Sequence, residues 1–73
     1  MELVFTDHAQ YRMAKRGITQ TMVEQTLQQP DTRGFRYGGR HVALKAFSQG
    51  TVKVVYVVEG AAHVIITVMW RSP

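Results

Sequence analysis

The sequence predicts a two-layer α+β domain in which two short helices precede an antiparallel sheet of three or four strands. Apolar residues recur at helical spacing in residues 7–16 and 20–29. Runs with strand character then occupy residues 40–47, 51–59 and 62–70, and the second of them is rich in valine. Because only short turns separate those runs, we expect neighbouring strands to pair antiparallel as a meander.

The first apolar run, Leu3–Phe5, predicts a short N-terminal strand that leads directly into the first helix. Thr6 and Asp7 are both good N-cap residues, because a side-chain oxygen can accept a free backbone N–H. We expect this helix over residues 7–16, with Gly17 in the left-handed conformation that ends many helices.

The second helix is expected over residues 20–29. Thr19 precedes it as an N-cap candidate, and Pro30 ends it, because the residue before a proline is biased away from the helical conformation. Its buried stripe should consist of four residues at helical spacing: Met22, Val23, Thr26 and Leu27.

The glycines at positions 38 and 39 predict a hairpin in which a strand at 35–37 meets the strand at 40–47 through a two-residue turn. The two later strands are apolar on both faces. Strict alternation would place Val54, Tyr56 and Val58 opposite Val55 and Val57, and Val64, Ile66, Val68 and Trp70 opposite Ile65 and Met69. Since two short helices can cover only one face, we expect a second copy (a homodimer) or a protein partner on the other.

Length and composition fit a single domain over residues 1–73. A chain of 73 residues buries only about 60% of the surface that its unfolded form exposes, so its stability should be marginal. It has no cysteine, so disulfides cannot stabilise it. No apolar run approaches the ~20 residues of a membrane helix, and the N-terminus lacks the pattern of a signal peptide. We therefore expect a bacterial, cytoplasmic protein.

The net charge is +4, from nine Lys and Arg against five Asp and Glu, and it favours anionic partners such as nucleic acid. The alternative is that the charge serves solubility alone. The first helix concentrates polar residues on one face, where a histidine, a tyrosine and two cations can bind phosphate and transfer protons. The alternative there is an ordinary solvated face, with Ala9 and Met13 toward the core and Arg16 at the border. The residues of the face are His8, Tyr11, Arg12 and Lys15.

Arginines and aromatic residues are interleaved around the predicted hairpin. This pattern suits single-stranded nucleic acid, whose bases stack on rings and whose phosphates pair with cations. An edge strand guarded by charge against aggregation is the alternative, and the sequence does not choose between them. The residues are Arg33, Phe35, Arg36, Tyr37 and Arg40.

The histidines do not predict a metal site. No two of them lie four residues apart on a helix, and the chain offers no cysteine ligand. His41 and Lys45 share one face of their strand, while His63 and Thr67 lie four residues apart on the last strand. The sequence also lacks a phosphate loop, a nucleophile elbow and a dinucleotide fingerprint, so we expect neither metal nor cofactor.

The stretch from His8 to Ile18 resembles the opening motif of a small bacterial domain family of unknown function, with the pattern HAxxRMxxRGI. Members continue with a second helix and a proline, as this chain does with Pro30, and close on a strand similar to Val64–Val68. The family is similar to the RelE/ParE-like toxins, whose fold is shared with metal-independent ribonucleases. The resemblance implies a RelE/ParE-like fold and an endoribonuclease toxin of a toxin–antitoxin pair, with RNA as substrate and an antitoxin as partner.

The resemblance also implies roles for individual residues. The catalytic residues would be His8 as general acid or base, Arg16 and Arg40 for charge stabilisation, and Thr67 to orient the phosphate; Arg12, Lys15, Arg36 and Lys45 would hold the substrate. RelE-type toxins carry functional residues in a C-terminal extension, in place of which this sequence offers Tyr56 or Tyr37. The alternative function is a non-catalytic protein-binding or dimerising domain of the same fold, such as a ParE-like inhibitor or a mobile-element protein.

Overall fold

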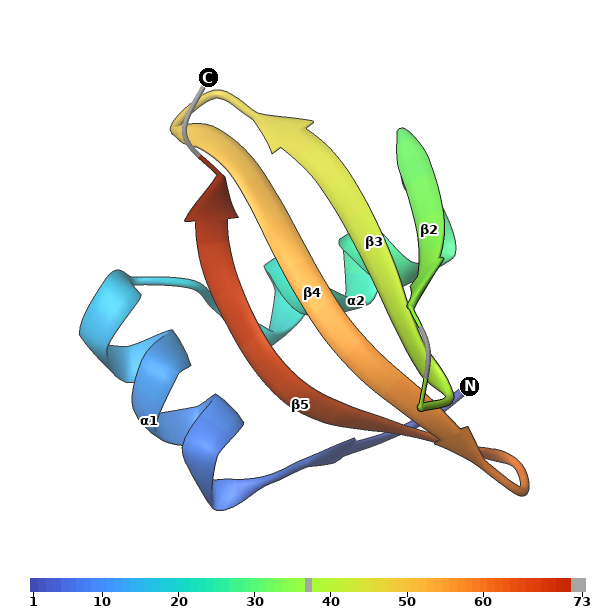
Figure 1. Cartoon of the computed structure of the whole chain (residues 1–73). Helices are drawn as coiled ribbons and strands as arrows, with labels where there is room; N and C mark the ends of the chain where they lie inside the picture. The colour runs from blue at the N-terminus through green and yellow to red at the C-terminus, as the bar shows by residue number, and fades with distance from the viewer. Residues whose placement is uncertain (37, 72–73) are drawn as a thin grey trace.

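The computed structural model describes residues 1–36 and 38–71, and it confirms the α+β class. Both helices lie on the same side of one five-stranded sheet, as Figure 1 shows. The elements in chain order are β1 (Glu2–Phe5), α1 (Asp7–Arg16), α2 (Gln20–Gln28), β2 (Thr32–Arg36), β3 (Arg40–Phe47), β4 (Gly50–Glu59) and β5 (Ala62–Arg71).

Helix α1 has the bounds and the caps that its sequence predicts. The Thr6 hydroxyl accepts a hydrogen bond from the Ala9 backbone N–H at 3.1 Å, which satisfies one of the free donors at the helix start. Gly17 ends the helix with φ 67°, a conformation that costs glycine little because it has no Cβ. Ala9 and Met13 are buried and attach the helix to the core.

Helix α2 is also confirmed, although it ends at Gln28, one residue before the predicted end. Gln29 leaves the helical region at φ −136° and ψ 63°, as expected for the residue that precedes Pro30. The start is capped by the Thr19 hydroxyl, which accepts from the Met22 N–H at 3.1 Å. The buried residues are those predicted: Met22, Val23, Thr26 and Leu27. Neither described helix is long and apolar enough to cross a membrane.

The sheet has the order β1-β5-β4-β3-β2, antiparallel from β5 to β2 but parallel between β1 and β5. The prediction of an antiparallel-only meander was therefore wrong at the β1 edge. Thr6 connects β1 to α1, and its N–H and hydroxyl both donate to the Ile65 carbonyl, at 3.3 and 2.9 Å. These bonds hold β1 beside a strand that no short turn could have joined to it.

A β-bulge in β5 changes which of its side chains share a face. Val55 pairs with Thr67 and Tyr56 pairs with Ile65, so Ile66 is the extra residue. The predicted alternation along the last strand was therefore wrong, because side chains before and after a bulge exchange faces. Ile65 and Val68 both lie in the main core as a result.

The first hairpin differs from its prediction in register. Its last described pair is Arg36 with Arg40, whereas a two-residue turn at 38 and 39 would pair Arg36 with His41, so the expected two-residue turn was wrong. Gly38 and Gly39 have φ values of 82° and 75°, which glycine adopts without strain. Tyr37, expected at the end of the first strand, lies outside the described residues.

The two faces of the sheet are packed differently. The helix side carries the main core, in which Val23 of α2 and Val54 of β4 are fully buried. The other face, which we call the open face, is turned away from both helices (Figure 1). Even so, its Val42, Leu44 and Val55 are only 6–8% exposed. Their burial by neighbouring side chains of the sheet reduces the apolar surface left for a second copy or partner to cover, and the homodimer stays a prediction.

Candidate functional site

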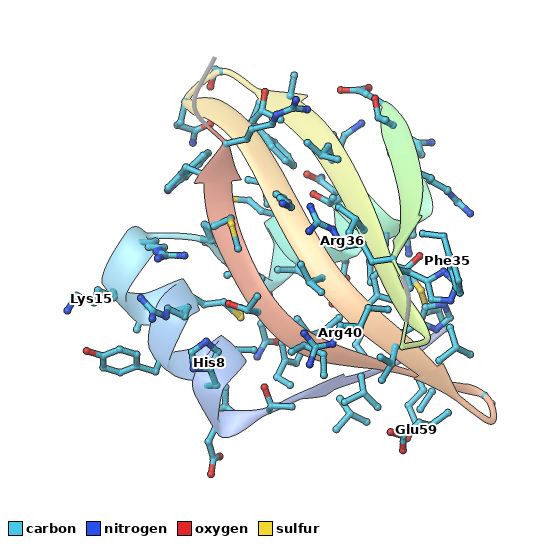
Figure 2. All side chains as sticks on the ribbon, in the orientation of Figure 1. His8, Lys15, Phe35, Arg36, Arg40 and Glu59 are labelled. Carbon is cyan, nitrogen blue, oxygen red and sulfur yellow. The ribbon has the colours of Figure 1, made fainter. Side chains whose placement is uncertain are left out.

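The polar face of α1 is exposed as its sequence predicts. His8 and Lys15 both lie on the exposed face of α1, beside the sheet (Figure 2). Lys15 Nζ donates a hydrogen bond to the Tyr11 hydroxyl at 3.2 Å and lies 5.4 Å from the centre of the Tyr11 ring. The guanidinium carbon of the half-buried Arg12 lies 6.0 Å from the same ring. This face is therefore a cationic surface arranged around one tyrosine.

Arg16 joins α1 to the sheet instead of projecting into solvent. Its Nη1 donates to the Val68 carbonyl at 2.8 Å, and the Trp70 indole N–H donates to the Arg16 carbonyl at 2.7 Å. We call Arg16, Val68 and Trp70 the seam. The catalytic role implied for Arg16 stays a prediction, but this hydrogen bond directs the guanidinium toward the backbone of β5.

Lys45 also makes a hydrogen bond within the fold. Its Nζ donates to the Gln29 carbonyl at 2.9 Å, where a cation complements the negative end of α2. Its implied role in substrate binding also stays a prediction. Binding a phosphate through Lys45 would compete with this cap.

Arg36 of β2 and Arg40 of β3 lie directly opposite each other at the end of the first hairpin. Both are exposed, and Figure 2 shows them over the strands, on the side away from α2. Like charges in opposite positions of an antiparallel pair destabilise a sheet. A bound anion would remove that penalty, so this arginine pair has the chemistry of a phosphate site.

Thr67 shares the open face with the arginine pair. It lies opposite Val55, which lies opposite Val42, one pleat along β3 from Arg40. With two inter-strand spacings of about 4.8 Å, β3 and β5 are about 10 Å apart, and Arg40 lies one pleat further along β3. The predicted catalytic residues therefore do not meet in one cluster: Arg40 and Thr67 are on the open face, and His8 is on α1.

The helix side carries a row of rings that crosses three strands into β5. Phe35 of β2 meets His41 of β3 edge-on, with ring centres 4.9 Å apart. His41 stacks on Tyr56 of β4 at 5.2 Å and 18°, and Tyr56 lies 5.5 Å from His63 of β5. Tyr56 is 8% exposed and Phe35 is 68% exposed, so this ring row runs from the core to the solvent at the sheet edge.

A family model of a domain of unknown function, DUF4258, matches residues 5–70. The chain belongs to this family. No curated protein and no solved structure matches the chain. The matched region spans the arginine pair, the ring row and the polar face of α1.

Sequence reasoning missed the ring row of this DUF4258 domain because of one residue of register. With a two-residue turn at 38 and 39, Arg36 would lie opposite His41 and Phe35 opposite Val42. The longer connection shifts the pairing by one, which moves Phe35 to the face of His41 and brings the two arginines together. The paired glycines marked the turn but did not specify its length.

The DUF4258 domain also contains a buried polar atom without a hydrogen-bond partner, Nδ1 of His63. Within the described residues, no three side chains of the His, Cys, Asp and Glu types gather in a metal-binding arrangement. The half-buried His63 ends the ring row at β5, where its ring contacts the buried Tyr56.

Proposed function

We propose that this domain is a metal-independent endoribonuclease toxin of the RelE type, the toxic member of a toxin–antitoxin pair. The observation that supports it most is the arginine pair, two like charges held opposite each other on the open face. RNA supplies the phosphate that such a pair requires, and the net charge of +4 attracts a polyanion to the whole domain.

The cleavage would proceed by attack within the RNA. A base removes the proton of a 2′-hydroxyl, whose oxygen then bonds to the adjacent phosphorus while the bond to the 5′ oxygen breaks. An acid returns a proton to that leaving oxygen, and the products are a 2′,3′-cyclic phosphate and a free 5′-hydroxyl. The phosphorane formed on the way carries extra negative charge, which cations stabilise.

The residues divide between these tasks by position. The exposed imidazole of His8 is suited to proton transfer, Arg40 with Arg36 to stabilising the phosphorane, and Thr67 to orienting the phosphate. Since the proton-transfer group and the cations that stabilise the phosphorane must act on one phosphate, this division requires His8, on α1, to reach the phosphate that the arginine pair binds on the open face. The assignment is supported by the stretch that begins at His8, which resembles the opening motif of a family similar to the RelE/ParE-like toxins.

The test is cleavage of a fluorescent RNA by the purified protein in EDTA, with the new ends identified by mass spectrometry. We expect a cyclic phosphate and undiminished activity in the chelator. His8→Gln should reduce the rate by about 10²–10⁴-fold, the usual range for losing a general acid or base, with an unchanged melting temperature. Gln28→Ala, at an exposed site on α2, is the control.

Failure of the wild-type protein to cut RNA, with or without ribosomes, would contradict the proposed function. A loss of activity in His8→Gln that merely follows a lower melting temperature would instead indicate that His8 is structural. If the protein is the toxin of a toxin–antitoxin pair, the gene beside its own should encode an acidic or DNA-binding antitoxin.

A second candidate function is non-catalytic protein binding, as a ParE-like inhibitor, a mobile-element protein or a homodimer. The exposed Phe35 on the edge strand β2 favours it, because large exposed apolar side chains are common in interfaces. Light scattering at increasing protein concentration would detect a dimer. A strictly monomeric protein that copurifies with no partner would count against this function.

A further inference from the structure

The edge strand β2 presents different chemistry on its two faces. It is the last strand of the sheet, and all five of its residues are exposed. Because side chains alternate along a strand, Phe35 lies on the helix side with the ring row and Arg36 lies on the open face with Arg40. The last two residues of the strand therefore place a phenylalanine on one face and an arginine on the other, while Arg33, opposite the core residue Ala43, shares the face of Phe35.

The aromatic surface is connected to the main core through ring contacts. Phe35 contacts His41, His41 stacks on Tyr56, and Tyr56 is in the main core. The only large aromatic ring of the row that is mostly exposed is Phe35, at 68%. A ring held in this way loses little conformational freedom when another flat ring stacks on it.

The cationic surface requires a partner of opposite charge. Arg36 and Arg40 lie opposite each other in register; the residue across the sheet from Arg40 is the uncharged Val57, since His41 pairs with Tyr56, and the next residue of β4 on that face is Glu59. A strand edge that only needed protection from aggregation would be served by a single charged residue. It would gain nothing from placing two arginines opposite each other or from exposing a phenylalanine.

We propose that a single strand of nucleic acid lies along the β2 edge, with a phosphate on the arginine pair and a base on Phe35. A nucleotide carries its phosphate and its base on opposite sides of the sugar, and this edge carries arginine and phenylalanine on opposite faces. A duplex cannot bind in this way, because its bases are stacked inside the helix. The inference rests on the proposed function for its choice of RNA. It adds that the substrate is single-stranded and that it lies along the β2 edge.

The first test measures binding of fluorescent eight-nucleotide uridine RNA by anisotropy, with duplex RNA and oligothymidine DNA in parallel. We expect the single-stranded RNA to bind at least tenfold more tightly than the duplex. Phe35→Leu, which removes the ring but keeps an apolar side chain, should weaken binding by about 5- to 100-fold, and Phe35→Tyr should restore it. Val58→Ala, an exposed apolar truncation on β4, is the control.

The second test addresses the arginine pair through salt. Arg36→Gln and Arg40→Gln should each lower the slope of log affinity against log salt by about 0.7, the value for one phosphate contact of a single strand. Arg71→Gln removes an arginine from the opposite end of the open face, where Arg71 pairs with Thr51, and it should leave the slope unchanged.

The outcomes separate this inference from the proposed function. Single-stranded RNA that binds at the β2 edge without being cut would support the inference and contradict the ribonuclease. Cleavage that is insensitive to Phe35→Leu would support the ribonuclease and contradict the inference. Equal binding of duplex and single-stranded RNA would overturn the inference. Polyglutamate that displaces the RNA from the wild-type protein at equal charge concentration would also overturn it, in favour of an acidic protein partner. Equal binding of the RNA and DNA oligomers would support the site and assign it to single strands of either sugar.

Discussion

The seam and the hairpin of β2 and β3 use arginine in opposite ways. At the seam, Arg16 donates to the Val68 carbonyl and accepts from Trp70, so both its side chain and its backbone are bonded. At the hairpin, Arg36 and Arg40 face each other in an exposed pair, beside a phenylalanine that is 68% exposed. The contacts of the seam contribute stability, whereas two like charges opposite each other at the hairpin oppose it.

The largest expected effect follows from cutting the seam. Trp70→Ala removes a ring that packs on the main core and leaves the Arg16 carbonyl without its donor, so it should cost about 3 kcal/mol of unfolding free energy. Phe35→Ala, at the hairpin, should change stability by less than about 0.5 kcal/mol. Urea denaturation of both variants measures the difference. Similar losses of unfolding free energy in the two variants would mean that the seam does not contribute more stability than the hairpin.

A smaller effect is expected from the side chain of Arg16. Arg16→Ala should cost about 1–2 kcal/mol, because a charged donor to the Val68 carbonyl is lost at a half-buried site. Measuring RNA cleavage in the same preparation sharpens the comparison. If Arg16 acts on substrate, as the RelE resemblance implies, cleavage should fall further than the loss of folded protein explains. If it only holds the seam, activity per folded molecule should be unchanged.

The smallest effect has the opposite sign. Arg40→Gln removes the repulsion across the hairpin and should stabilise the free protein by about 0.2–1 kcal/mol at low salt. The gain should disappear at high ionic strength, because exposed charges are screened. Arg71→Gln serves as the control for a lower net charge. Destabilisation by Arg40→Gln at low salt would show that the pair is already compensated within the fold.

The parts of the fold that the sequence predicted are those set by neighbours in the chain. The Thr6 and Thr19 caps, the Gly17 terminus and the stripe on α2 depend on residues within one or two turns, and each was confirmed. The parallel pairing of β1 was not predictable in this way. It depends on contacts between Thr6 and Ile65, residues that are 59 positions apart.

The candidate site was less predictable because it depends on register. The sequence placed arginines and aromatic residues together at the hairpin, but only the observed pairing assigns them to opposite faces. The contacts of Arg16 and Lys45 with backbone carbonyls were also not predictable, because the residues around each cation do not indicate which distant carbonyl it will contact. The sequence shows which reactive and charged residues are present, whereas only the fold shows which of them are exposed for binding and which support the structure.

The parallel pairing of β1 with β5 also has a consequence for biosynthesis. Thr6 leaves the ribosome well before its acceptor Ile65, from which it is separated by 59 residues. At about 5–20 residues per second, that interval lasts about 3–12 s. During this time β1 has no neighbour, and α1 lacks the strand that supplies the seam. The domain can therefore close only after almost all of its sequence has been translated, and a nascent chain shorter than this cannot present a finished sheet.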